Sequence, residues 1–61
     1  MSDILTVKEA AKLTRLSVGT VYQYVERKRL PHLKVGAKLL FEREALLGWL
    51  ASHRVSTLDA R

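Results

Sequence analysis

The chain has 61 residues, of which 48% are hydrophobic and 28% charged, and it carries no cysteine and a net charge of +5. This length accommodates one domain, and the lack of cysteine excludes a disulfide scaffold and a zinc site built on thiolates. No apolar run approaches the roughly 18 residues of a membrane span, and the first residues lack the basic and apolar regions of a signal peptide. The sequence therefore predicts one small cytoplasmic globular module with no membrane partner.

The positive charge is concentrated in the middle of the chain. Residues 15–43 carry seven Lys or Arg and two Asp or Glu, whereas residues 1–14 and 44–61 are each neutral overall. The helix dipole would explain cations at one helix end, but that effect covers only residues 27–29. Basic residues gathered in one stretch are typical of proteins that bind polyanions, so the composition favours nucleic acid as the partner.

The first helix is predicted over residues 7–13. Thr6 and Glu9 have the Thr-x-x-Glu spacing of a capping box, in which each side chain satisfies a backbone N–H at the start of a helix. Apolar residues follow at helical spacing, and two consecutive alanines are small enough to let another helix approach closely. Residues 14–16 are then expected to form a tight turn.

A second helix is predicted from Val18 to about Lys28, with Ser17 as its N-cap and Leu30-Pro31 as its stop. Its i, i+3, i+4, i+7 spacing assigns four residues to the inner face. These inner residues are Val18, Val21, Tyr22 and Val25. The same pattern leaves an outer face formed by Thr20, Gln23, Tyr24 and Arg27.

A short β-hairpin is expected over residues 32–41, because Gly36 suits the positive φ of a two-residue turn. Apolar residues alternate along both arms, so one set of side chains is expected to point inward. These side chains belong to Leu33, Val35, Leu39 and Phe41. Lys34 and Lys38 then face outward near the tip of the hairpin.

A third helix is predicted over about residues 43–53. Its apolar stripe contains Leu46, Trp49, Leu50 and His53. Trp49 is expected to clamp this helix onto the first helix and the hairpin, and His53 to act as a cation or cap at the helix end. Residues 55–61 are expected to form a flexible tail, which leaves residues 1–54 as the domain.

In this order the elements define a small winged helix-turn-helix, an α+β fold that is mainly α-helical. The second helix fits the major groove of DNA, and the hairpin, or wing, can lie on the backbone or in the neighbouring minor groove. Hydroxyl, amide and cationic side chains on these two elements are therefore the expected contacts. The predicted DNA-binding residues are Arg15, Ser17, Thr20, Gln23, Tyr24, Arg27, Lys34 and Lys38.

The sequence offers no set of residues suited to catalysis, a metal or a cofactor. His32 and His53 are far apart with no cysteine between them, and the carboxylates are nowhere clustered. Glu42 and Glu44 lie on different faces of a helix start, where they are expected to act as end charges rather than as an acid–base pair. Neither a phosphate-binding loop nor a nucleophile elbow is present. We therefore expect no enzymatic activity and no cofactor.

Short sequence blocks across residues 5–53 resemble one known family in their order and spacing. The blocks are Leu5-Thr6-Val7-Lys8-Glu9-Ala10-Ala11, Leu16-Ser17, Thr20-Val21-Tyr22, Leu30-Pro31, Val35-Gly36, Phe41, Leu46 and Trp49-Leu50. The set is similar to excisionase-type helix-turn-helix domains, small relatives of the MerR DNA-binding domain. The resemblance implies binding of double-stranded DNA through the second helix and the wing. Family members either direct a site-specific recombinase toward excision or act as small transcriptional regulators.

Three positions depart from the family pattern. Arg15 and Lys28 stand where the family commonly has glycine, and Gln23 stands where arginine is frequent. Arg15 would add a phosphate contact, whereas Lys28 would cost on the order of 1 kcal/mol relative to glycine if its backbone is left-handed. Glutamine prefers adenine edges where arginine prefers guanine, so a shifted target sequence is expected.

The sequence leaves three roles open. A unit of this size buries a small interface, so useful specificity would require copies side by side on DNA or a partner protein. The first role is an excisionase-like factor that directs an integrase on DNA. The alternatives are a small transcriptional regulator with the same DNA-binding mode, acting on the transcription machinery, and a protein-interaction module whose basic middle faces an acidic partner. For the DNA-binding roles, association with the nucleoid of a prokaryote or with a mobile element is expected.

Overall fold

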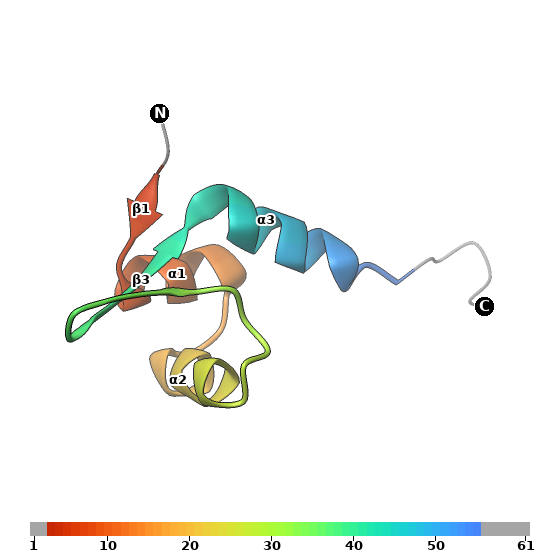
Figure 1. Ribbon diagram of the computed structural model, residues 1–61. Coiled ribbons are helices and arrows are strands. Elements are labelled where there is room, and N and C mark those ends of the chain that lie inside the picture. The colour runs from red at the N-terminus through yellow and green to blue at the C-terminus, as the bar shows by residue number, and fades with distance from the viewer. Residues whose placement is uncertain (1–2, 56–61) are drawn as a thin grey trace.

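The computed structural model describes residues 3–55, which form three helices and three short strands (Figure 1). This architecture confirms the small, mainly helical winged helix-turn-helix fold. The elements are β1 (Ile4–Leu5), α1 (Val7–Thr14), α2 (Val18–Glu26), β2 (Leu33–Val35), β3 (Lys38–Glu42) and α3 (Arg43–Ser52). Most of the tail that was expected over residues 55–61 lies outside the described residues.

The capping box at the start of α1 is formed as the sequence predicts. The Thr6 N–H donates to Glu9 Oε1 at 2.9 Å, and the Glu9 N–H donates to Thr6 Oγ1 at 3.2 Å. At the other end, α1 includes Thr14, which was expected in the turn. The buried Thr14 hydroxyl donates to the Ala10 carbonyl at 2.8 Å, so a polar side chain is accommodated inside the helix pair.

The strands form an antiparallel sheet in the order β1-β3-β2. The sequence predicted the hairpin of β2 and β3 but missed β1, in which Leu5 pairs with Phe41. Two residues are too few to display the alternation that identifies a strand. The Arg43 N–H donates to the Asp3 carbonyl at 3.0 Å and extends this pairing to the start of α3. The N-terminal residues thereby tie the hairpin to the helices.

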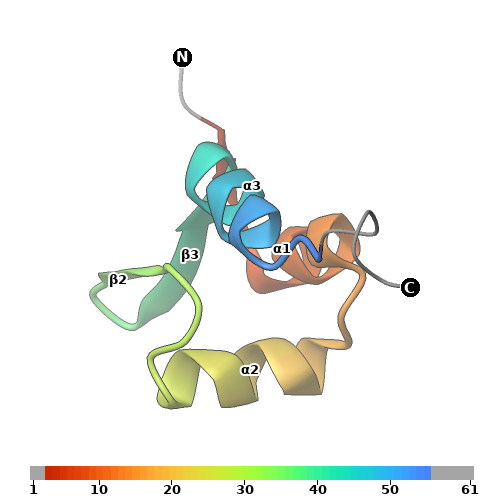
Figure 2. The same cartoon turned by 90° about the vertical axis from the view of Figure 1, so that its right-hand side faces the viewer.

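The core lies where the two alanines of α1 meet the neighbouring elements. In both views, α2 and α3 lie on opposite sides of α1, and the hairpin projects to one side (Figures 1 and 2). The buried apolar residues come from α1, α2, the loop after α2, β3 and α3. They are Ala10, Ala11, Val21, Leu30, Phe41 and Leu46. The small side chains of α1 thus allow close packing on both of its sides.

The inner face of α2 differs from the one that the spacing predicts. Val21 is buried and Tyr24 and Val25 are half-buried, whereas Tyr22 is 51% exposed and Val18 is 39% exposed. Both assignments satisfy helical spacing around Val21, so the periodicity alone could not separate them. The surrounding elements decide the question, because Tyr24 packs against Trp49 of α3 and belongs to the hydrophobic groups around the core. The expected burial of Val18 and Tyr22 and the expected exposure of Tyr24 were therefore wrong.

The tip of the wing is less covered than the alternation predicts. Val35 is 60% exposed, while Phe41 at the base of the hairpin is buried. The hairpin projects past the helices, so its inner face meets other elements only near the base (Figure 1). The expectation that Val35 points into the core was therefore wrong. Gly36 has the positive φ that was expected of the turn, at 60°.

Candidate nucleic-acid interface

The start of α2 is held by a side-chain cap. The Ser17 hydroxyl oxygen accepts from the Thr20 N–H at 3.1 Å, and the same hydroxyl donates to Thr20 Oγ1 at 2.9 Å. Because Ser17 uses its proton here, the Thr20 hydroxyl keeps its own proton for an external acceptor. The first turn of α2 contains no acidic residue, so the positive end of the helix dipole is not neutralised within α2.

A groove of about 720 Å³ separates the outer face of α2 from the wing. Tyr22, Gln23 and Glu26 line it from α2, and Lys34 and Lys38 line it from the hairpin. Figure 2 shows the hairpin beside the later half of α2, so two consecutive elements of the chain form one surface. The groove combines an amide, a phenol and a carboxylate with two ammonium groups. These groups can contact base edges and phosphates from adjacent positions.

The structure brings most of the predicted DNA-binding residues to one region. Gln23, Lys34 and Lys38 meet at the groove, and Ser17 and Thr20 lie at the start of α2. Arg15 precedes this cap as an exposed residue of the turn, and Arg27 is exposed directly after α2. Of the predicted residues, the structure thus places Gln23, Lys34 and Lys38 in the groove, and it places four others at the two ends of α2, namely Arg15, Ser17, Thr20 and Arg27.

Tyr24 does not belong to this surface. Its ring packs against Trp49 of α3, with centroids 5.9 Å apart and planes at 74°. The aromatic side chain that α2 presents to the groove is Tyr22. Glu26 was also missed, because a carboxylate repels phosphate and was not expected at a DNA contact. Glu26 follows Tyr22 by four residues, and this spacing places the two side chains on the same face of the helix.

Basic residues of this surface have no carboxylate partner in the described part of the chain. Across residues 3–55, the ion pair present is Arg43 Nε to Asp3 Oδ2 at 3.8 Å, and both side chains are about half exposed or more. The cations around α2 and on the wing are thus available to an external anion. This arrangement supports the polyanion partner that the charge distribution predicts.

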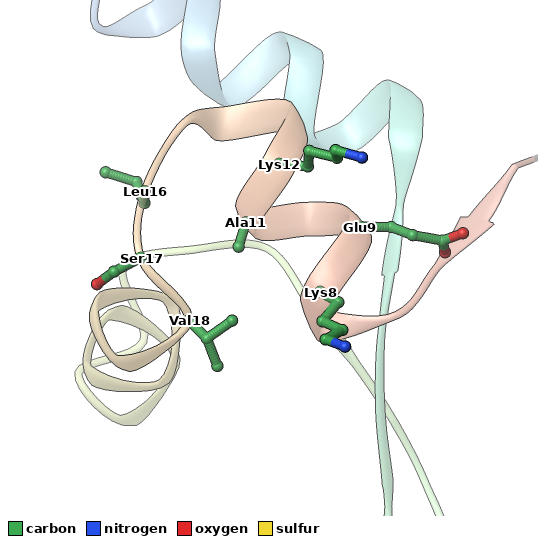
Figure 3. A pocket seen from close by; sticks show the side chains of 7 residues that line it. All are labelled: Lys8, Glu9, Ala11, Lys12, Leu16, Ser17 and Val18. Carbon is green, nitrogen blue, oxygen red and sulfur yellow. The ribbon is translucent and has the colours of Figure 1, made fainter.

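A second groove, of about 550 Å³, lies between α1 and the start of α2 (Figure 3). Ala11, Leu16 and Val18 supply its apolar atoms, and Lys8 and Lys12 supply its charge. Lys8 was not among the residues predicted to bind DNA, because residues 1–14 are neutral overall. The carboxylate of the neighbouring Glu9 accepts the capping hydrogen bond from Thr6, so it is directed to the helix start.

The turn between the two helices has a left-handed residue. Arg15 has φ 63° and ψ 26°, its N–H donates to the Ala11 carbonyl, and the Leu16 N–H donates to the same oxygen at 3.1 Å. This geometry closes α1 and redirects the chain into α2 within three residues. The helix-turn-helix thus depends on a conformation that glycine would adopt with less strain.

No helix in the described range 3–55 is long and apolar enough to cross a membrane. In the same range, no group of three or more His, Cys, Asp or Glu is placed to hold a metal ion.

Together, the paired helices, their tight turn and the basic hairpin define a winged helix-turn-helix unit. The match of residues 4–54 to the helix-turn-helix domain family agrees with this geometry. The chain therefore belongs to that family, which is an excisionase-type helix-turn-helix family. Its members are typically non-enzymatic, and the family indicates DNA binding. Comparison with curated proteins and with solved structures found no match.

Proposed function

We propose that this protein binds double-stranded DNA sequence-specifically, with α2 in the major groove and the wing on the backbone or in the adjacent minor groove. The observation that carries the proposal is the groove between α2 and the wing, in which Gln23 lies opposite Lys34 and Lys38. A major groove admits one helix, and a hairpin beside that helix reaches the neighbouring backbone. The domain that performs this function extends over residues 1–54.

Each residue of the surface has a role that follows from its chemistry. Gln23 offers an amide that can bond bidentately to adenine, so it sets sequence preference. Thr20 and Ser17 lie where the helix start meets a phosphate. Arg15, Lys34 and Lys38 bind phosphates, and Arg27 extends the contact edge of α2.

The biological role that we propose is an excisionase-like recombination directionality factor in the cytoplasm, associated with the nucleoid. The basis is the excisionase-type family to which residues 4–54 belong. A single small domain buries a modest interface, so copies bound side by side and a recombinase partner would supply the remaining specificity. A small transcriptional regulator would use the same DNA contacts, and the partner protein distinguishes the two roles.

A fluorescence-anisotropy titration of a labelled mixed-sequence duplex at about 50 and about 200 mM salt tests DNA binding. Four to six neutralised phosphates predict that log affinity falls with log salt at a slope of about −4 to −5. Lys38→Glu should weaken binding to all sequences alike, because it reverses a charge in the wing. Absence of binding at the lower salt would overturn the proposal and direct attention to an acidic protein partner.

A further inference from the structure

Each of the two helices of the helix-turn-helix is followed by a residue in the left-handed conformation. α2 is followed by Lys28 with φ 56°, whose N–H donates to the Val25 carbonyl at 2.9 Å. The next N–H, that of Arg29, donates to the Tyr24 carbonyl at 2.8 Å. These two bonds are the Schellman pattern, in which the left-handed residue is usually glycine. The end of α1 repeats the left-handed residue at Arg15, with φ 63°.

Both left-handed positions carry a cation. Within residues 3–55, Arg15 and Lys28 are the two residues other than glycine with positive φ, and both side chains are exposed. Neither takes part in an ion pair in this part of the chain. Side chains strain a left-handed backbone because Cβ approaches the following carbonyl oxygen. Residues held in such conformations cluster at active and ligand-binding sites.

The two residues bracket α2. Arg15 stands two positions before the N-cap Ser17, and Lys28 stands two positions after the last helical residue, Glu26. Nine helical residues at about 1.5 Å each give α2 a length of about 13 Å. The major groove is about 12 Å wide and is bordered by two rows of phosphates, so cations just beyond the two ends of α2 can each reach one row.

We propose that Arg15 and Lys28 form a phosphate clamp, in which each binds a phosphate on one side of the major groove that receives α2. This inference rests on the proposed function and adds Lys28 to the residues that contact DNA. Each cation also lowers the stability of the free protein, because its backbone is held in the left-handed conformation. Replacing either cation with glycine should therefore change stability and DNA affinity in opposite directions.

The test compares Arg15→Gly and Lys28→Gly with the unaltered chain by urea unfolding and by duplex binding. Each glycine should raise the folding equilibrium constant about threefold, because the released strain exceeds the added entropy of the unfolded chain. Each should also weaken binding of a mixed-sequence duplex about fivefold and make the salt slope shallower by about 1. Arg54→Gly after α3 is the control for charge loss alone and should leave the salt slope unchanged.

Asparagine variants separate the effect of the charge from the effect of the backbone conformation. Arg15→Asn and Lys28→Asn tolerate the left-handed conformation and remove the charge, so they should bind DNA as weakly as the glycine variants. Arg15→Lys and Lys28→Arg should keep the salt slope of the unaltered chain. More stable glycine variants with unchanged affinity would overturn the clamp while leaving the proposed function intact. An unaltered chain that binds no duplex would overturn both, whereas weaker binding by Lys38→Glu with full binding by the glycine variants would overturn the clamp alone.

Discussion

Tyr24 and Trp49 meet edge to face, with ring centroids 5.9 Å apart, and this contact joins α2 to α3. The Trp49 indole N–H also donates to the Arg29 carbonyl at 2.7 Å. On its other side, the indole lies 4.4 Å from the His53 ring, whose Nδ1 is 2.8 Å from the Trp49 carbonyl oxygen. The expected cap at the end of α3 is thus formed by His53. Trp49 fixes the segment after α2 as well as packing on the core.

Removal of the indole N–H should destabilise the domain without changing its surface. Trp49→Phe leaves an aromatic ring near Tyr24 but leaves the Arg29 carbonyl without its donor, which should cost about 1 kcal/mol. For a domain of this size, that loss corresponds to a decrease in Tm of about 4–8 °C. Thermal unfolding followed by circular dichroism measures the decrease. An unchanged Tm would show that the hydrogen bond to Arg29 contributes nothing to stability.

The two tyrosines of α2 should behave in opposite ways. Tyr24→Ala removes a half-buried ring that packs on Trp49 and should cost about 2–3 kcal/mol, less than a fully buried aromatic would. Tyr22→Ala changes a side chain that is 51% exposed and should alter stability by less than about 0.5 kcal/mol. Tyr22→Ala should instead weaken duplex binding, because its ring lines the groove beside Gln23. Urea unfolding measures stability and fluorescence anisotropy measures duplex binding on the same samples. Equal destabilisation by both variants would contradict the packing of Tyr24 and the exposure of Tyr22.

The tyrosines also mark the limit of what the sequence could predict. Local rules identified the helices, because the Thr6–Glu9 capping box and the Ser17 cap depend on residues three apart. The inner face of α2 depends on where α3 lies, which is a tertiary property. The pairing of β1 with β3 and the exposure of Val35 likewise follow from how the elements pack. Among the expected contact residues, Tyr24 lies on the face of α2 that packs on Trp49, which the spacing within α2 could not indicate.

The capping box at the start of α1 supplies a test of stability, and Thr6 also lines the groove beside α2. Thr6→Ala removes the acceptor of the Glu9 N–H and should destabilise the domain by about 1 kcal/mol. Thr6→Ser keeps the hydroxyl and should preserve most of the stability, which makes it the matched control. Equal unfolding midpoints in urea for the two variants would contradict the role of the cap.

Gln23 should govern which DNA sequence is preferred. Its amide lies in the groove, where a bidentate bond to adenine is worth about 1–3 kcal/mol of discrimination. Gln23→Ala should therefore reduce or change the preference found by selection from random-sequence duplexes. Its affinity for mixed-sequence DNA should change little, in contrast to Lys38→Ala, which should weaken all sequences alike. A selected sequence that is the same for Gln23→Ala and the unaltered chain would contradict the placement of α2 in the major groove.

Glu26 should limit affinity and increase selectivity. It is a carboxylate in a groove that also contains Lys34 and Lys38, so it repels phosphate where those lysines attract it. A carboxylate can also accept a hydrogen bond from cytosine N4, which makes its presence favourable on a matching sequence. Glu26→Gln should tighten binding to mixed-sequence DNA about threefold and lower the preference for the selected site about tenfold.

Glu44→Gln in the first turn of α3 is the matched control for Glu26→Gln, since it removes the same charge from an exposed helix position outside the groove lining. Glu44→Gln should leave the affinities for mixed-sequence DNA and for the selected site unchanged. It should lower the free energy of unfolding by less than about 1 kcal/mol through the helix dipole. Competition between the selected site and mixed-sequence duplex measures the preference directly. If Glu26→Gln binds mixed-sequence DNA no more tightly than Glu44→Gln does, the carboxylate does not face the phosphates and the groove does not receive DNA.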